Sequence, residues 1–462
     1  MREAIYRLVI YYLRFFVRVT LFLHKPTVVG ITGSVGKTST HNAVYLMLKD
    51  HFPTKMVKKG NSEIGIPLGI LGLPIGTNSF WDWLRILFFT PFRLNYLRKT
   101  QYLVVEMGVD EPNPPKNMEY LLTIVQPQIC ILLNVHPVHT MQFEQAIPNI
   151  LENSKLSAKE KMDLILKRIA EEKGKIFTHN PKCKTVIFNA DNSYASDVVN
   201  IYKNSLTTPD KQFFSFGEKE DNDISFKGFD INLGGSIFDF QLKDNNKKIS
   251  LKFKHYLMPE VYEETFAAAI LVGLSVGLTT QQITKSLVDN YELPEGRSSL
   301  LEGIKNSTII DSSYNASKRP VLAFLSLLEK LKLEEKRPTV FLFGDMRELG
   351  GRAETEHKEV AEHMPGVVDY LYCVGPLTQK YVVPRLERYL REVKWFKDSK
   401  TAGQYLKDHL PEKALVLVKG SQNTIFLEEA ISFILKNPED VKKLCRQDEF
   451  WQKKKLKFFS SV

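Results

Sequence analysis

The sequence predicts an α/β protein: a doubly wound, mainly parallel sheet with a phosphate-binding loop (P-loop), a small antiparallel sheet, and a C-terminal Rossmann-like α/β domain. Three observations indicate this fold class. A β-branched run at 27–31 leads through a glycine-rich turn into an apolar helical pattern. Residues 211–256 alternate apolar and polar side chains, and strand-like and helix-like segments alternate after residue 293.

Three parts are predicted along the 462 residues, which are too many for one compact domain. They are a helix at 1–25, a nucleotide-binding α/β domain at 26–292, and a smaller α/β domain at 293–462 that ends in a basic tail. In the middle part, buried strands are expected near 27–31, 102–106, 129–134 and 185–189. In the last part, strands separated by helices are expected at 308–311, 339–344, 369–375 and 414–420.

The composition and charge exclude several classes of protein. With 43% hydrophobic and 25% charged residues, the chain is typical of a globular protein rather than a disordered or fibrous one. The four cysteines lie far apart without a CxxC pair, which argues against a zinc site and fits the reduced thiols of the cytoplasm. The net charge is +10, of which residues 1–25 contribute +4 and residues 441–462 contribute +5. Because the body is nearly neutral, no nucleic-acid groove is expected.

The first segment, residues 4–23, reads AIYRLVIYYLRFFVRVTLFL. Arg7, Arg14 and Arg18 interrupt the apolar core that a signal peptide needs, and they fall within about 40° of one another on a helix, with the apolar side chains opposite. Burying each arginine in a bilayer would cost about 2.5–3.5 kcal/mol. The segment is therefore expected either to lie in a membrane interface or to pack on the protein's own body or a partner subunit. Residues 451–459 either assist at an anionic surface or form a solvated, frayed end.

The glycine-rich turn predicts a nucleotide site. It follows a short strand, opens a helix, and reads TGSVGKTST over residues 32–40. Glycines let backbone N–H groups turn toward phosphates, and the helix N-terminus favours their negative charge. Lys37 would reach the β- and γ-phosphates, and the Thr38 hydroxyl would bind Mg²⁺. Because Ile31 stands where the strict P-loop pattern has its first glycine, the match is to a tighter TGxxGKT turn. The expected nucleotide contacts are Gly33, Ser34, Val35, Gly36, Lys37, Thr38 and Ser39.

Several further segments, taken in order with this turn, resemble the Mur ligase superfamily of ATP-dependent amide ligases, which has folylpolyglutamate synthetases as relatives. The resemblance runs from about residue 27 to about residue 435. It is greatest to the branch that adds D-alanyl-D-alanine in peptidoglycan assembly. The segments that carry it are KGNSEIGIPL (59–68), YLVVEMG (102–108), ILLNVHPVH (131–139), FNAD (188–191), GR (296–297), IIDSSYNA (309–316), GDM (344–346) and VKGS (418–421).

The resemblance implies ATP and Mg²⁺ as cofactors and a reaction through an acyl phosphate. It implies four metal ligands: Thr38, Glu106, His139 and a carbamylated Lys161. Lys159 is an alternative to Lys161, and a further alternative is that Lys161 is an unmodified, exposed lysine on a helix face. Two features depart from the family here: the stretch between His139 and Lys161 is longer than usual, and Asp163 replaces the usual glutamate. Glu106 suits a hard cation that prefers oxygen ligands.

Other site residues are also implied by the resemblance. Arg297, at a Pro/Gly-rich hinge, would join Lys37 and Lys161 as a catalytic residue by reaching the phosphates when the C-terminal domain closes. Asp311 is expected on the nucleotide side. Substrate contacts are expected from Asn61, Asn315, Asp345 and Lys419. Three positions depart from the family pattern: Glu264, Ser312 and Gln422.

The sequence thus predicts an ATP-dependent ligase that adds D-alanyl-D-alanine or an amino acid to a cell-wall precursor in the cytoplasm. Only about 25 residues precede the P-loop strand, so the N-terminal domain that holds the UDP-sugar in this branch is expected to be missing. Two alternatives stay open: a folylpolyglutamate-type, poly-γ-glutamate or lipid-linked wall-precursor ligase, and a non-catalytic ATP-binding scaffold. The oligomeric state is not predicted.

Overall fold

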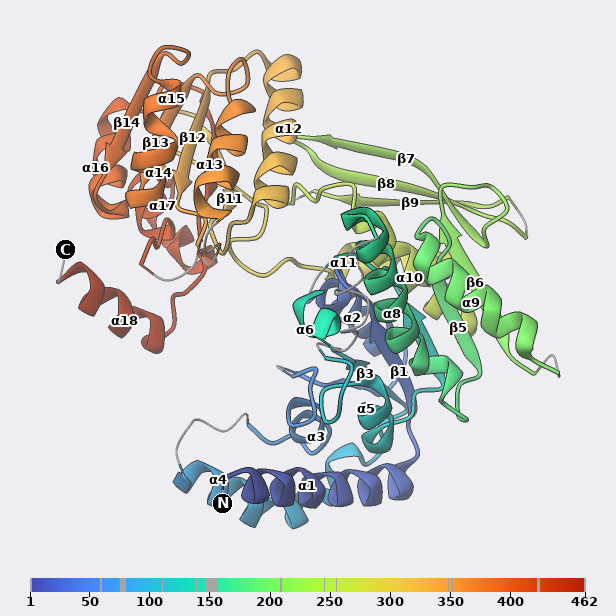
Figure 1. Cartoon of the computed structure of the whole chain (residues 1–462). Coiled ribbons are helices and arrows are strands. Elements are labelled where there is room, and N and C mark those ends of the chain that lie inside the picture. Colours follow the sequence, from blue (N-terminus) through green and yellow to red (C-terminus); the bar gives the residue numbers. More distant parts are fainter. Residues whose placement is uncertain are drawn as a thin grey trace. The chain divides into compact units, whose positions relative to one another are not determined.

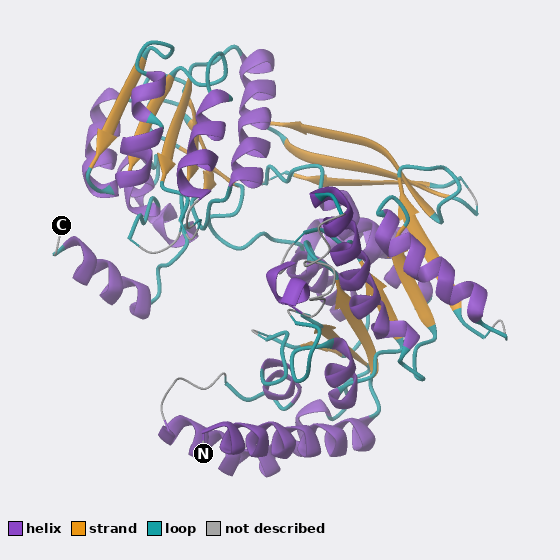
Figure 2. Ribbon diagram, in the orientation of Figure 1, coloured by secondary structure: helices purple, strands orange, loops and turns teal. Residues whose placement is uncertain are grey.

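The computed structural model describes two compact units (Figures 1 and 2). It describes all residues except 1, 59, 75–79, 110, 138–139, 146–155, 208–209, 245, 255, 348, 350–351, 422–423 and 461–462. The first unit comprises Met1–Gly228, Phe238–Leu251 and Val261–Tyr291. The second comprises Phe229–Ile237, Lys252–Glu260 and Glu292–Val462. The main division therefore falls beside the predicted 292/293 boundary, whereas the two short segments that join the second unit were not predicted.

The first unit contains most of a sheet with the strand order β2-β3-β1-β4-β5-β6-β7-β8-β9, and parts of β7, β8 and β9 belong to the second unit. From β2 to β7, every neighbouring pair is parallel. Every residue of β3, β4 and β5 is buried, which explains their unbroken apolar runs. The strands are β1 (Thr27–Thr32), β2 (Thr54–Met56), β3 (Tyr102–Glu106), β4 (Ile129–Leu132), β5 (Thr185–Asn189), β6 (Gln212–Gly217), β7 (Ile224–Asn232), β8 (Gly235–Leu242) and β9 (Lys248–Phe253).

The alternating stretch at 211–256 is part of this same sheet. Strands β8 and β9 bury nearly every second residue, as the alternation predicts. Strand β6, however, pairs in parallel with both β5 and β7, so the predicted antiparallel character does not hold for the beginning of the stretch. Alternating apolar and polar side chains indicate that one face of a strand is exposed, but they do not indicate whether the neighbouring strand is parallel or antiparallel.

Helices cover the sheet and include one that is buried on nearly all sides, α10, whose segment TFAAAILVG is uniformly apolar or small. Helix α8 begins with a capping box in which Ser157 and Glu160 satisfy each other's backbone N–H groups. The helices of the first unit are α1 (Arg2–His24), α2 (Lys37–Lys49), α3 (Gly65–Ile70), α4 (Phe80–Phe89), the 3₁₀ helix η1 (Thr90–Leu97), α5 (Met118–Ile124), α6 (Thr140–Gln145), α8 (Ala158–Thr178), α9 (Ser193–Ser205), α10 (Tyr262–Ser275) and α11 (Thr280–Asn290).

Helix α1 packs on its own unit, which is one of the predicted alternatives. Ile10, Leu13 and Val17 are buried, and the Tyr12 hydroxyl donates a hydrogen bond of 3.0 Å to the carbonyl of Leu87. The predicted division into an arginine face and one apolar face is wrong in detail. The apolar residues form two opposite stripes, one buried and one exposed, and the arginines border the exposed stripe. Among the described residues, no helix is both long enough and apolar enough to cross a membrane.

The second unit is a six-stranded sheet with the order β10-β11-β15-β12-β13-β14, in which only β10 runs antiparallel to its neighbour. The four predicted strands are present, and β10 and β14 add an edge on each side. The predicted α/β fold class, with a large mostly parallel sheet and a second sheet, is therefore confirmed. The strands are β10 (Ser299–Glu302), β11 (Thr308–Ser312), β12 (Thr339–Gly344), β13 (Tyr370–Val374), β14 (Glu392–Phe396) and β15 (Leu415–Lys419).

Hydrophobic cores lie on both faces of this second sheet, because its parallel strands alternate with helices. One core contains Val321 and Leu328, from the longest helix of the unit. The other contains Ala402 and Ile431. The helices are α12 (Lys318–Glu335), α13 (Ala353–Glu362), α14 (Pro376–Tyr381), α15 (Val383–Leu386), α16 (Ser399–His409), α17 (Glu428–Ile434), the 3₁₀ helix η3 (Pro438–Lys443) and α18 (Glu449–Phe459).

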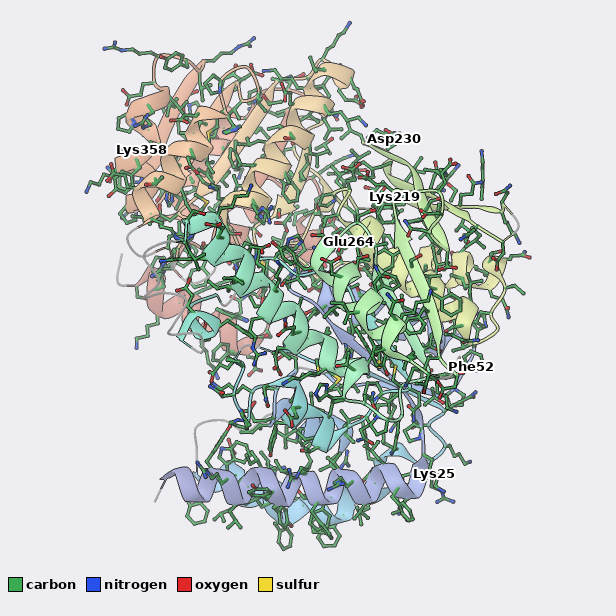
Figure 3. The ribbon with its side chains drawn as sticks, turned by 45° about the vertical axis from the view of Figure 1, so that its right-hand side comes forward. Lys25, Phe52, Lys219, Asp230, Glu264 and Lys358 are labelled. Carbon is green, nitrogen blue, oxygen red and sulfur yellow. The ribbon has the colours of Figure 1, made fainter. Side chains whose placement is uncertain are left out.

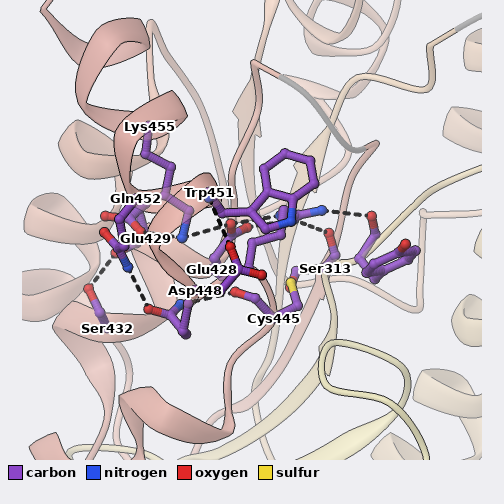
Figure 4. Close-up of polar contacts among 12 residues, drawn as sticks. Ser313, Glu428, Glu429, Ser432, Cys445, Asp448, Trp451, Gln452 and Lys455 are labelled. Atoms are coloured by element: carbon purple, nitrogen blue, oxygen red, sulfur yellow. Dashed lines mark hydrogen bonds and ion pairs between the residues drawn. The ribbon is translucent and has the colours of Figure 1, made fainter. Parts of the chain in front are cut away.

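The basic tail forms helix α18, and a buried ion-pair cluster ties it to the second unit (Figure 4). Arg446 and Glu428 pair at 2.6 Å, with side chains that are 1% and 0% exposed. Lys455 lies 3.1 Å from Glu428 and 2.8 Å from Glu429. Within residues 451–459, Lys455 is buried in this cluster, whereas Lys453, Lys454 and Lys457 are exposed. The alternative of a solvated, frayed end therefore holds for most of the tail's cations but not for Lys455.

Candidate functional site

The P-loop joins β1 to α2 and presents its turn at the surface. Val35 and Thr38 are exposed, and Ser34 and Lys37 are partly buried. Gly36 caps the start of α2 with φ +83°, a conformation that favours glycine. The Lys37 ammonium folds back over the loop and donates to the carbonyls of Gly33 (2.9 Å) and Ser34 (3.1 Å). The remaining predicted contact, Ser39, lies in the first turn of α2.

Asn134, which sequence reasoning missed, clamps this loop. Its Oδ1 accepts from the Val35 backbone N–H at 2.9 Å, and its Nδ2 donates to the Val35 carbonyl at 3.2 Å. The clamp exists because β1 and β4 pair in parallel, with Thr32 opposite Leu132, so the residues that follow each strand lie side by side. The signal that could have found it is the asparagine that ends the buried run ILLN.

Glu264 supports the clamp from α10. Its carboxylate accepts a 2.7 Å hydrogen bond from Asn134 Nδ2. Burial raises the pKa of Glu264 above its ordinary value, and the hydrogen bond from Asn134 partly offsets that rise. The departure at this position therefore has a structural role, because the glutamate orients the asparagine that holds the P-loop.

Thr38 and Asn61 converge on Glu106. The Thr38 hydroxyl donates to one carboxylate oxygen of Glu106 at 2.9 Å, and Asn61 Nδ2 donates to the other at 3.0 Å. Glu106 ends β3, and the register that places it opposite Ile31 brings it beside the start of the P-loop. The approach of Asn61 needs a glycine at 108, because a Cβ there would lie 2.7 Å from the Asn61 side chain.

This group fits a magnesium ion. A hydroxyl and a carboxylate are the hard oxygen donors that Mg²⁺ prefers, and Mg²⁺ at a nucleotide site usually takes one or two protein ligands, with phosphates and waters completing the shell. Within the described part of the chain, no group of three or more His, Cys, Asp and Glu side chains is arranged to hold a metal. Thr38 and Glu106 would therefore hold the ion together with a bound triphosphate.

The other two predicted metal ligands are His139 and Lys161, and their role as ligands stays a prediction. His139 lies outside the described residues. Lys161 lies in the first turns of α8 and is partly buried, and its alternative Lys159 is exposed. Asp163, which replaces the family's usual glutamate, accepts from Tyr194 at 2.9 Å and pairs with Lys167 at 2.8 Å. The hydrogen bond from Lys167 lowers the pKa of that carboxyl.

A second polar cluster lies at the carboxyl ends of β11 and β15 in the second unit. The Lys419 ammonium donates to Ser312 Oγ (3.1 Å) and to the Asn315 carbonyl (2.9 Å), since Ser312 and Lys419 are paired across the two strands. Burial, together with the Arg297 charge, lowers the pKa of Lys419 to about 7. Ser312, the second departure from the family pattern, is thus an acceptor for Lys419, whereas Gln422 lies outside the described residues.

Asp311 lies beside this cluster and is fully buried. One carboxylate oxygen accepts from the Ser313 backbone N–H at 3.0 Å, and the other has no hydrogen-bond partner among the described residues. Burial raises the pKa of Asp311 to about 6. A buried carboxylate with an unpartnered oxygen can accept a hydrogen bond from a ligand.

The remaining predicted residues of the second unit have local partners. The Arg297 guanidinium lies 4.7 Å from the centre of the Tyr314 ring. The Asn315 side chain accepts from the Ala316 backbone N–H at 2.9 Å. Asp345 accepts from the backbone N–H groups of Leu377 (3.1 Å) and Thr378 (2.8 Å) at the start of α14, and burial raises its pKa. Asn315 and Asp345 follow the central strands β11 and β12. The Asp345 carboxylate already accepts hydrogen bonds from the start of α14, so it caps that helix.

Comparisons with known proteins bear on both units. The family model of the Mur ligase middle domain matches residues 31–157, and that of the Mur ligase glutamate ligase domain matches residues 296–422. Together they span more than half of the chain. The chain is 27% identical over 402 residues to the UDP-N-acetylmuramoyl-tripeptide–D-alanyl-D-alanine ligase of Rickettsia prowazekii, covering 86% of this chain and 76% of that one.

Solved structures share the fold. A MurF structure from Acinetobacter baumannii superposes with a TM-score of 0.67 at 20% identity, covering 90% of this chain and 78% of that chain. MurF of Thermotoga maritima, solved in complex with ADP, gives a TM-score of 0.63 at 21% identity, with coverages of 94% and 84%. At these identities the likeness establishes the arrangement of the elements, and the site rests on the geometry above.

Proposed function

This chain belongs to the Mur ligase family, and we propose that it joins D-alanyl-D-alanine, or another amino acid or dipeptide, to a carboxylate of a peptidoglycan precursor. Mur ligases are ADP-forming enzymes that use ATP and Mg²⁺. The observation that carries the proposal is the convergence of Thr38 and Asn61 on Glu106 beside an exposed P-loop. We assign nucleotide binding to residues 26–292 and further nucleotide and substrate contacts to residues 293–462.

In the proposed reaction, the substrate carboxylate takes the γ-phosphoryl group of ATP, ADP leaves, and the amine then displaces phosphate to form the amide. Both reacting groups are anionic, so the site has to supply positive charge. Lys37 supplies it by exchanging the Gly33 and Ser34 carbonyls for phosphate oxygens. Thr38 and Glu106 would hold Mg²⁺, which would neutralise phosphate charge when bound. Asn61 keeps the Glu106 carboxylate oriented.

The other predicted site residues enter the proposal in the roles that the resemblance implies. Arg297 would reach the phosphates, and Lys161 with His139 would hold a second metal ion. Asp311 has a free oxygen suited to the nucleotide side. We assign the substrate side to Asn61, Asn315, Asp345 and Lys419.

We place the enzyme in the cytoplasm, where ATP and nucleotide-linked precursors are found, with peripheral membrane contact through residues 1–25. The tail at 451–459 is a weaker candidate for that contact, because its Lys455 is buried in an ion pair with Glu428.

The test is a ligation assay with ATP, Mg²⁺, UDP-MurNAc-tripeptide and D-alanyl-D-alanine, read by phosphate release and by the mass of the product. We expect the amide product, and we expect Lys37→Ala to abolish it. Lys49→Ala, at the other end of the same helix, is the matched control and should remain active. Turnover with other carboxylate and amine pairs only would refute the substrate, and substrate-independent nucleotide binding without turnover would refute the ligase.

A further inference from the structure

Helix α1 carries a continuous apolar stripe on its outer side. Leu8, Tyr11, Phe15 and Phe22 are 70%, 52%, 61% and 73% exposed. Their spacings of three, four and seven residues place them within about 60° of one another on a helix. The buried residues Ile10, Leu13 and Val17 lie on the opposite side, so the exposed stripe takes no part in anchoring α1 to the unit. Figure 3 shows side chains projecting from the outer side of this helix, with Lys25 at one end.

A second stripe lies beside the first, on α4 and η1. Trp81, Leu84, Phe88 and Phe92 again recur at three- and four-residue spacing and are 75%, 42%, 66% and 72% exposed. Two hydrogen bonds hold the two segments side by side. The Tyr12 hydroxyl donates to the Leu87 carbonyl at 3.0 Å, and His24 Nε2 lies 2.9 Å from the Leu94 carbonyl oxygen. Both views of the whole unit show α1 and α4 together at its edge (Figures 1 and 3).

This combined surface, the α1–α4 surface, concentrates the exposed apolar side chains of the molecule. Of the seventeen large apolar side chains that are exposed among the described residues, ten belong to α1, α4 and η1. An apolar area gathered in this way marks an interaction site, whereas scattered exposed apolar residues need no explanation.

Cations border the surface. Arg14 lies 4.6 Å from the centre of the Tyr11 ring, and Lys25 lies 5.6 Å from that of Phe22. Next to them opens a cavity of about 860 Å³ whose lining includes five basic side chains and one acidic one: Arg14, Arg18, Lys25, His179, Lys182 and Glu119. The positive charge is thus placed along one margin of the aromatic stripe, beside a hollow large enough for a phosphate-bearing headgroup.

We propose that the α1–α4 surface docks on an anionic lipid bilayer, with the aromatic side chains inserted among the lipids and the basic cavity receiving lipid phosphates. Aromatic and aliphatic side chains backed by Arg and Lys are the composition of helices that lie in a membrane interface. At 1.5 Å per residue, α1 would lie flat over about 34 Å. The inference deepens the membrane contact proposed above and is independent of the ligase reaction.

A second copy of the chain is a poorer occupant for this surface. A twofold contact would cover the apolar stripes, but it would bring no anionic groups to the arginine and lysine margin or to the basic cavity. An anionic bilayer accepts the apolar stripe and the cationic margin at once. Charge complementarity therefore favours the lipid.

The test is flotation of the purified full-length protein with vesicles, without nucleotide or substrate. We expect binding to phosphatidylcholine vesicles that contain about 30 mol% phosphatidylglycerol, and much weaker binding to pure phosphatidylcholine. The double variant Phe15→Asp/Phe22→Asp should bind at least about tenfold more weakly, because two inserted rings are lost. Leu333→Asp, at a 72% exposed leucine of the second unit, is the matched control and should bind as the wild type does.

The basic cavity is tested by Arg18→Glu/Lys182→Glu, which should abolish the preference for phosphatidylglycerol. Circular dichroism establishes that each variant is folded. The proposal is overturned if the wild type ignores anionic vesicles, or if the aspartate variant binds them as well as the wild type does. It is also overturned if the aspartate substitutions convert a dimer into a monomer in vesicle-free light scattering, since the surface would then cover a second copy.

Discussion

The P-loop group of the first unit and the Asp311–Lys419 cluster of the second lie at the same kind of place, the carboxyl ends of parallel strands, but they hold charge differently. In the first, the partly buried Lys37 ammonium donates to the backbone carbonyls of Gly33 and Ser34, and Glu106 receives two hydrogen bonds. In the second, burial brings the pKa of Asp311 to about 6 and that of Lys419 to about 7. The comparison indicates that the first group is ready to exchange partners for phosphate, whereas the second holds charges that burial disfavours.

The largest expected effect concerns the first group. Glu106→Gln keeps the shape and an acceptor for Asn61 but removes the charge that holds Mg²⁺. We expect kcat/KM for Mg-ATP to fall by about 10²–10³-fold, with little change in stability. The measurement is phosphate release over a Mg²⁺ titration. Glu111→Gln, in a surface ion pair with Lys116, is the control. If Glu106→Gln had normal activity, the P-loop group would not need this charge, and the difference drawn between the two groups would be contradicted.

The next effect concerns the second group. Native Asp311 binds its proton more tightly than the unfolded chain does, so its contribution to stability is present below about pH 3.9 and is lost as the pH rises through about 6. Asp311→Asn should therefore gain about 2–3 kcal/mol in the free energy of unfolding, relative to the wild type, between pH 4 and pH 7. Urea unfolding of both proteins across that range measures the difference.

The control for this variant is Asp244→Asn, at an exposed turn of the first unit, whose difference from the wild type should stay flat with pH. Lys419 makes stability depend on pH in the opposite direction. Because its pKa is lowered, the unfolded chain binds more protons between about pH 7 and 10.4, and stability should rise with pH there. Lys419→Met should remove that rise, and a rise that persisted would contradict the buried ammonium.

The smallest effect concerns the clamp on the P-loop. Asn134→Ala removes two hydrogen bonds to Val35, and we expect KM for ATP to rise by about tenfold while kcat changes less, since the loss is about 1–1.5 kcal/mol. Asn192→Ala is matched to it, because Asn192 accepts from the neighbouring Val135 N–H and caps α9. It should lower stability without moving KM.

Much of the first site could be predicted from the sequence because it depends on short segments. Each of these segments can be recognised from its own residues: the run TVVGI, the TGxxGKT turn and the strand that ends in Glu106. Parallel pairing of β1 with β3 then brings Thr38 to Glu106. Glu264 could not be interpreted in the same way. It lies 130 residues from Asn134, and only the fold shows that the two side chains meet.

The other misses have similar causes. Edge strands β10 and β14 were not predicted because they are short and half-exposed and lack an unbroken apolar run. The two apolar stripes of α1 could not be separated from the sequence, since periodicity shows which residues share a face and does not show which face is covered. Lys455 is buried because carboxylates of α17 pair with it, whereas a basic run in the sequence predicts solvent-exposed side chains.

The most direct measurement of the central claim is a crystal structure with a non-hydrolysable ATP analogue and Mn²⁺, located by its anomalous signal. We predict the triphosphate on the loop from Gly33 to Thr38, with Lys37 on its β- and γ-phosphates and the metal bound between the Thr38 hydroxyl, Glu106 and the phosphates. A nucleotide bound elsewhere, or a metal ion that touches neither Thr38 nor Glu106, would contradict the account.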